Sequence, residues 1–196
     1  DRVEKEIYKL TSIDVDTKVF EGIYKDSTEV KKIFEKGYET AYKKTNRQTY
    51  QAMEAFIHNL NTMHSRAGAQ VPFSSVNFGT DTSPEGRMVI KNFLLATDAG
   101  LGRNETPIFP ISIFKLRKGT NYEVTDPNYD LFKLAIKVSA KRLFPNFSFM
   151  DSSFNKPYYK GDYNTEVAYM GCRTRVMANV VDEDKAITPG RGNLSF

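Results

Sequence analysis

Apolar residues recur at three- and four-residue spacing in two stretches near the start of the chain, residues 27–44 and 47–64. This spacing places apolar side chains on one face of a helix, so it predicts an α-helix in each stretch. Asp26 or Ser27 can cap the first helix, because a short polar side chain accepts hydrogen bonds from free N–H groups of the first turn. Both apolar faces are typical of packing within a subunit. A contact between subunits is the alternative.

Further along, four short stretches of alternating or continuous apolar residues predict strands. They are residues 70–78, 108–116, 147–150 and 166–170. The last residues of the chain, from Asn193 onward, also resemble the start of a strand.

Two helices are predicted between these strands. Ser83-Pro84 predicts the start of the first, with serine as the cap and proline at the first helical position, and Gly100 or Gly102 predicts its end. Asp126-Pro127 predicts the start of the second by the same chemistry, and Pro145 its end. Strands that alternate with helices favour crossover connections, and therefore an α/β fold with a parallel sheet.

Composition restricts the class of protein. The chain has 196 residues and a formal net charge of +4. That excess is too small for the basic stripe expected of a protein that binds a nucleic-acid polymer, although it suits an anionic small molecule such as a nucleotide. We find no apolar run long enough to span a membrane and no signal peptide. The chain lacks an initiator Met, and we expect it to be a central piece of a larger protein.

Cys172 is the only cysteine of the chain, so it can form neither an internal disulfide nor a cluster of thiolates around a metal ion. A lone thiol of this kind fits a reducing cytoplasm. It can be an inert core residue, a nucleophile, a redox sensor or a radical carrier. Gly171 before it and Arg173 and Arg175 after it make a plain core strand a poor interpretation. The only histidines, His58 and His64, do not complete a recognised metal-ligand spacing with it.

Several longer blocks carry a resemblance to a known family. They are residues 64–75, 77–80, 107–110, 126–132, 170–175 and 190–196. Together and in this order, they resemble the large catalytic subunit of class III, anaerobic ribonucleotide reductases. The resemblance covers roughly residues 45 to 196, and the first 44 residues match less distinctively.

The resemblance implies a fold and an activity. The fold is a ten-stranded α/β barrel, of which residues 67–196 would form about the first half. Residues 1–66 would be a helical segment that supplies dimer contacts and lies near the effector site. The activity is the reduction of ribonucleoside triphosphates. Cys172 would be the radical cysteine, whose thiyl form abstracts the 3′ hydrogen of the ribose before the 2′ hydroxyl leaves as water.

The resemblance also implies a role for Asn193, whose amide would orient the ribose in the substrate pocket; a turn asparagine is the alternative. Ser74, Ser75 and Asn77 are candidate substrate-binding residues. Alternate residues of a strand share a face, so Ser75 and Asn77 would line one side and Ser74 the other. The alternative is that these polar groups hydrogen-bond to neighbouring backbone.

Arg173 and Arg175 could contact phosphates, although pairing with a carboxylate such as Asp151 or Asp162 is the favoured interpretation. No glycine pattern of a nucleotide-binding loop is present, so nucleotide binding is expected from the resemblance alone.

The family uses a glycyl radical, formate as reductant and a zinc site, and the resemblance implies that all three are carried or bound outside these residues. The implied partners are dNTP and ATP effectors, a second subunit in a homodimer, a radical-SAM activase and the remaining part of the same enzyme. We expect no nucleic-acid polymer and no membrane as partner, and a location in the cytoplasm, or in a host's cytoplasm for a phage protein. Two alternatives remain: another glycyl-radical enzyme of the formate-lyase type, or a split-gene half or relic that only binds.

Overall fold

The structure is a computed structural model, and it describes residues 2–11, 28–62, 70–161, 165–171, 174–176 and 193–195. The chain forms two compact units, Asp1–Gln51 and Ala52–Phe196. Helix α3, Thr28–Thr62, contributes residues to both units.

The described part of the first unit consists of helix α1, Arg2–Thr11, and the first part of α3. Ile7 of α1 is fully buried. A Cβ atom built on Gly37 would lie only 2.8 Å from Cγ1 of Ile7, so the missing side chain at Gly37 allows the two helices to approach closely. Lys44 Nζ lies 2.6 Å from Glu6 Oε1 at the edge of this contact.

The two helices predicted over residues 27–44 and 47–64 are a single helix, and the predicted break is wrong. Helix α3 runs without interruption for 35 residues. The polar residues Thr45, Asn46 and Arg47 interrupt the apolar stripe, but none of them is proline or glycine. The backbone therefore keeps its hydrogen bonds through this point. The predicted cap residues Asp26 and Ser27 lie outside the described residues.

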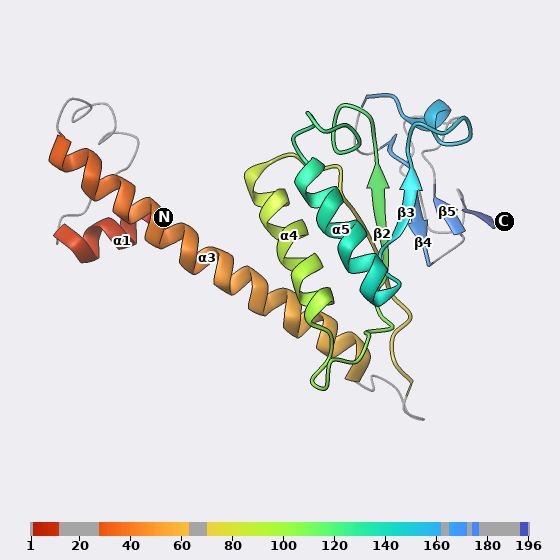
Figure 1. Ribbon diagram of the computed structural model, residues 1–196, viewed down its shortest axis with the longest axis horizontal. Helices are drawn as coiled ribbons and strands as arrows, with labels where there is room; N and C mark the ends of the chain where they lie inside the picture. Colours follow the sequence, from red (N-terminus) through yellow and green to blue (C-terminus); the bar gives the residue numbers. More distant parts are fainter. Residues whose placement is uncertain are drawn as a thin grey trace. The chain divides into compact units, whose positions relative to one another are not determined.

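The second unit contains a parallel sheet in the order β1-β2-β3, with β1 at Ser75–Phe78, β2 at Ile111–Leu116 and β3 at Asn146–Phe149. Helix α4, Pro84–Ala99, connects β1 to β2, and helix α5, Tyr129–Arg142, connects β2 to β3. The two helices lie side by side against the same sheet (Figure 1). The predicted parallel sheet with crossover helices is confirmed, although each strand is shorter than predicted or shifted.

The two faces of this sheet carry different side chains. Phe114 and Leu116 point toward the helices and form the core with residues of α4 and α5. The core cluster comprises Ile90, Leu94, Phe114, Leu116, Leu131, Ala135 and Val138. The opposite face carries Ser75, Asn77, Lys115 and Ser148, which alternate with the core residues along the three strands. We call this the polar face.

The ends of α4 are as predicted, and the start of α5 is not. Ser83 caps α4 by accepting a hydrogen bond from the Gly86 N–H at 3.0 Å, and Gly100 ends the helix at a φ of 75°. The predicted cap of α5, Asp126, instead closes the preceding turn by accepting from the Tyr122 and Glu123 N–H groups. The helix starts two residues later, after Asn128.

A second sheet is antiparallel and has the order β4-β5-β6. Its strands are Ala168–Met170, Thr174–Val176 and Asn193–Ser195, and a short 3₁₀ helix, Lys156–Tyr158, precedes them. The strand predicted over 166–170 and the one predicted from Asn193 are confirmed in part. Their antiparallel pairing with β5 was not predicted.

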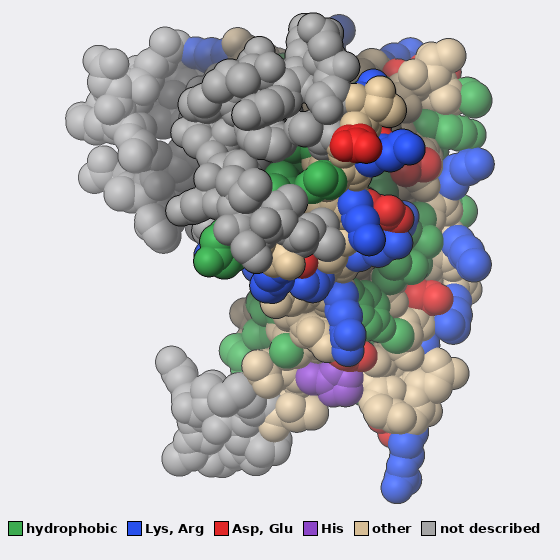
Figure 2. Space-filling view, turned by 90° about the vertical axis from the view of Figure 1, so that its left-hand side faces the viewer, with side chains coloured by type: hydrophobic (Ala, Val, Ile, Leu, Met, Phe, Trp, Pro, Cys, Tyr) green, Lys and Arg blue, Asp and Glu red, His purple; other side chains and the backbone are tan. Residues whose placement is uncertain are grey.

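None of the helices in the described part of the chain is long and apolar enough to cross a membrane. Figure 2 shows lysine and arginine side chains lying among acidic and other polar ones on the face that it draws.

Candidate functional site

Strand β4 is attached to the polar face by the side chain of Asn77. Its Nδ2 donates to the Tyr169 carbonyl oxygen at 2.7 Å, and the Tyr169 N–H donates to its Oδ1 at 2.8 Å. One amide therefore satisfies both backbone groups of one residue, as a neighbouring strand would. The two residues are 92 positions apart in the sequence.

Ser75 makes the next contact along the same strand. Its Oγ accepts from the Gly171 N–H at 3.1 Å and lies 3.5 Å from the Tyr169 carbonyl oxygen. Gly171 has a φ of 67°, which a side chain would strain, and a Cβ atom there would lie 3.1 Å from the Phe73 ring. The backbone that leads directly into Cys172 is thus held at Tyr169 and Gly171.

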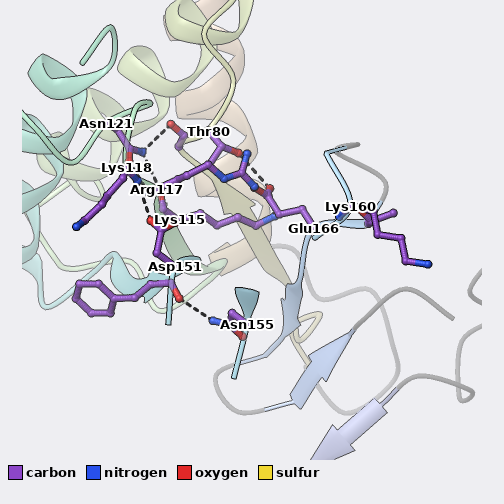
Figure 3. A network of polar contacts seen from close by, with 12 residues as sticks. Thr80, Lys115, Arg117, Lys118, Asn121, Asp151, Asn155, Lys160 and Glu166 are labelled. Atoms are coloured by element: carbon purple, nitrogen blue, oxygen red, sulfur yellow. Dashed lines mark hydrogen bonds and ion pairs between the residues drawn. The ribbon is translucent and has the colours of Figure 1, made fainter. Parts of the chain in front are cut away.

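A buried ion-pair network holds the segment in front of β4. Lys115 Nζ lies 2.7 Å from Glu166 Oε2, and Arg117 pairs with Glu166 Oε1 (Figure 3). Thr80 Oγ1 donates to the same carboxylate at 3.1 Å. The side chains of Lys115 and Glu166 are only 9% and 5% exposed, so each charge depends on the other for its stability. The Arg117 guanidinium also stacks on the Tyr159 ring, 3.9 Å from its centroid.

Buried asparagines shape the loops that follow the parallel strands. Asn121 donates to the carbonyl oxygens of Gly79 and Lys115, and Asn128 donates to those of Gly79 and Asp81. Both asparagines are fully buried. These amides satisfy backbone groups that no strand reaches, which keeps the carboxyl ends of β1 and β2 ordered.

The structure describes the predicted site residues unequally. Cys172 lies outside the described residues, between β4 and β5 in the chain. Asn193 begins β6, where its backbone pairs with Val176 of β5, so it belongs to the same small sheet as the strands that flank Cys172. Ser74 Oγ is buried and has no hydrogen-bond partner among the described residues.

Of the two arginines that come after the cysteine, Arg173 lies outside the described residues and Arg175 is buried. Arg175 Nη1 donates to the Phe154 carbonyl oxygen at 2.8 Å and to Asn155 Oδ1 at 3.0 Å. These contacts give Arg175 a structural role. The predicted carboxylate partner Asp151 accepts from the Lys118 N–H, and Asp162 lies outside the described residues.

An apolar hollow of about 200 Å³ lies on the helix-covered side of the sheet. It is lined by Met53, Phe56, Val76, Phe78, Val89, Ile90 and Phe93. These side chains offer a nucleotide no polar partner, so the hollow is a poor substrate site. Within the described residues, no group of three His, Cys, Asp or Glu side chains could hold a metal ion.

Comparison with known proteins identifies the family of this chain. The family model described as "Anaerobic ribonucleoside-triphosphate reductase" matches residues 8–196. The chain belongs to this family.

Curated members of the reductase family align over most of the chain. The anaerobic ribonucleoside-triphosphate reductases of Salmonella typhimurium and Escherichia coli are each 34% identical over 155 residues. The one from Enterobacteria phage T4 is 36% identical over 155 residues. These alignments cover 79% of this chain but only 21% of the two bacterial proteins and 25% of the phage protein. The chain therefore spans about a fifth to a quarter of these reductases.

The sequence alone did not predict the ion-pair network of Lys115, Arg117 and Glu166. Lys115 stands in an otherwise largely apolar strand, between Phe114 and Leu116, which is a recognisable signal of a buried charge. Its partner Glu166 lies 51 positions later, and no local pattern connects the two.

Proposed function

We propose that this chain carries the thiyl-radical site of an anaerobic ribonucleoside-triphosphate reductase. The active unit would be this chain combined with the part of the enzyme that it does not cover, which we call the assembled enzyme. One observation supports the proposal most strongly. In a chain of this family, two polar side chains of β1 hold the backbone that enters the only cysteine.

In this proposal the chain's residues position and shield a reactive sulfur. The Cys172 thiyl takes a hydrogen atom from C3′ of the ribose, which forms the S–H bond and leaves the radical on C3′. Loss of the 2′ hydroxyl as water comes next. A sulfur radical needs no charge, but it needs a site from which water and stray reductants are excluded. Asn193 would hold the ribose hydroxyls, because its amide both donates and accepts while a sulfur hardly does either.

The proposed setting is the interior of a ten-stranded α/β barrel, of which β1, β2 and β3 would be the first strands. Parallel strands with helices on one face and polar side chains on the other suit the wall of such a barrel, since interior and exterior residues alternate. The polar face would then look toward substrate, with Ser75 and Asn77 as the candidate contacts on it. Ser74, the third candidate, would lie on the other side of the strand.

The remaining parts of the proposal derive from family membership. The substrates would be ribonucleoside triphosphates, and dNTP and ATP would act as effectors. A glycyl radical installed by a radical-SAM activase would supply the radical, and formate the reducing equivalents. With the zinc site, these groups would lie outside this chain. We also propose a cytoplasmic location and a role in deoxyribonucleotide supply for DNA replication.

A homodimer that uses residues 1–66 is part of the same proposal. Tyr38 and Tyr42 lie one helical turn apart on α3, and each is 57% exposed, which gives this helix an apolar surface for a partner. Sedimentation of the assembled enzyme should show a dimer. A monomer both with and without nucleotide would remove this part of the proposal.

Replacement of the sulfur tests the function itself. Cys172→Ala in the assembled enzyme should abolish deoxynucleotide formation and leave the glycyl radical measurable by electron paramagnetic resonance. Loss of the radical signal in the variant would indicate a structural role for Cys172. Absence of deoxynucleotide from the unmodified assembled enzyme would instead favour a chain that only binds.

A further inference from the structure

We infer that Asn77, assisted by Ser75, is a positioning residue for the Cys172 sulfur, and that its partner is the backbone of β4. This inference rests on the proposed function, and it gives Asn77 a different task from the substrate contact that the sequence suggested. Asn77 uses both its donor and its acceptor on Tyr169. These polar atoms are therefore already engaged within the protein.

These contacts fix the backbone in front of the cysteine at two points. Asn77 and Ser75 point to the same side of β1, and they contact Tyr169 and Gly171 respectively. As β1 advances from residue 75 to 77, the contacted segment runs back from 171 to 169. The hydrogen bonds thus fix both the height of β4 above the sheet and its register along β1. The next peptide unit carries Cys172.

Gly171 makes this position sensitive. Its φ of 67° lies in the left-handed region, and the Phe73 ring leaves little space beside it. The backbone at Gly171 therefore keeps this conformation only while β4 is held against β1. The rate of hydrogen abstraction depends steeply on the position of the sulfur, because a displacement of about 1 Å can lower a rate about a hundredfold.

Asn77→Asp is the decisive variant. The aspartate is nearly the same size, and it can still accept from the Tyr169 N–H. At neutral pH, however, it cannot donate, and its second oxygen faces the Tyr169 carbonyl. We expect turnover in the assembled enzyme to fall about a hundredfold with KM little changed. Ser75→Ala removes the contact to the Gly171 N–H and the longer one to the Tyr169 carbonyl oxygen, but it leaves both Asn77 hydrogen bonds in place, so it should lower turnover by about tenfold or less.

The readout that separates positioning from general damage is the isotope effect with 3′-deuterated ribonucleotide. A misplaced sulfur makes hydrogen abstraction more rate-limiting, so the isotope effect on turnover should rise in Asn77→Asp. A smaller folded fraction lowers turnover without changing the isotope effect. The glycyl-radical signal, measured on the same samples, corrects for that fraction.

Asn61→Asp is the matched control. The Asn61 amide also holds backbone at both ends, donating to the Phe109 carbonyl oxygen at 2.6 Å and accepting from the Phe109 N–H at 3.1 Å. Its backbone partner lies just before β2, and in the described part of the chain it makes no hydrogen bond to β4. The control variant should lose stability and keep the isotope effect of the unmodified enzyme.

Three results would overturn the inference. Turnover and isotope effect in Asn77→Asp could equal those of the unmodified enzyme. KM could rise while turnover stays constant, which would make Asn77 a substrate contact. Turnover could fall equally in Asn77→Asp and Asn61→Asp with no change in isotope effect. These three results would leave the proposed function intact. If the unmodified assembled enzyme makes no deoxynucleotide, the proposed function is wrong, and so is the role of Asn77 that rests on it.

Discussion

The two faces of the parallel sheet are built by different physical means. The face under α4 and α5 is a continuous apolar core in which Phe114 and Leu94 have no exposed surface. The polar face also carries the buried Ile113, but hydrogen bonds and ion pairs hold the segments packed on it: Asn77 holds β4, and Lys115 holds Glu166. The apolar core is stabilised by area removed from water, and another apolar side chain of similar volume costs it little stability. The polar face depends on particular donors and acceptors, which fix one arrangement.

This difference explains how one sheet can have a stable core on one face and hold a second segment in a defined position on the other. Non-directional packing tolerates small shifts of the helices against the strands. A buried carboxylate between two cations does not, because an unpaired charge in the interior is strongly unfavourable. Residues 166–171, the segment that leads to Cys172, lie against the polar face.

The largest expected effect is on the apolar face. Phe114→Ala should lower the free energy of unfolding by about 4 kcal/mol, because it removes a fully buried ring and leaves a cavity. Urea denaturation of the chain measures this. Ile136→Ala, at a position on α5 that is 47% exposed, is the control and should be close to neutral. A loss below about 1 kcal/mol for Phe114→Ala would mean that the helices do not depend on this core.

The next effect tests the polar face. Glu166→Gln should cost about 3 kcal/mol, because it leaves Lys115 and Arg117 buried without their counter-charge. The control is Asp130→Asn, which removes a carboxylate paired with Arg87 where the two side chains are 60% and 30% exposed. We expect about 0–1 kcal/mol there. Equal losses for the two variants would show that the Glu166 network is solvated.

A smaller effect concerns the start of α4. Ser83→Ala should cost about 1 kcal/mol, since the Gly86 N–H loses its acceptor, while Ser83→Gly should cost only a few tenths. Thermal unfolding monitored by circular dichroism can rank the two variants. The reverse order would mean that the serine stabilises this turn through something other than its hydroxyl.

The smallest effect lies in the first unit, at ion pairs whose lysine side chains are largely exposed. Hydrogen bonds from Lys44 and then Lys9 lower the pKa of Glu6 below its ordinary value. Because the pKa is lower in the folded state, this contribution to stability is present above the unfolded pKa and is lost as pH falls through the folded pKa. In an NMR titration, Lys44→Met should raise the pKa of Glu6. Lys43→Met, which removes the cation that lowers the pKa of Glu39, should leave Glu6 unchanged.

The sequence predicted the helices on the apolar face well, but it did not predict the contacts made by the polar face. The start of α4 at Ser83 and its end at Gly100 depend on chemistry within one helical turn, so local patterns suffice. The unbroken α3 was missed because polar residues at 45–47 resemble a boundary but carry no helix breaker. The alternation along β1 correctly put Ser75 and Asn77 on one face. It could not reveal that their partners lie more than ninety positions away, since such pairing depends on the folded sheet.

Hydrogen exchange at two backbone amides tests most directly whether the polar face holds the segment that enters Cys172. The Tyr169 and Gly171 N–H groups donate to Asn77 and Ser75. Both should exchange much more slowly than their intrinsic rates in the unmodified chain. Asn77→Ala should accelerate exchange at both positions and leave amides in the middle of α4 unchanged. Exchange near the intrinsic rate in the unmodified chain, or rates that Asn77→Ala does not change, would contradict this account.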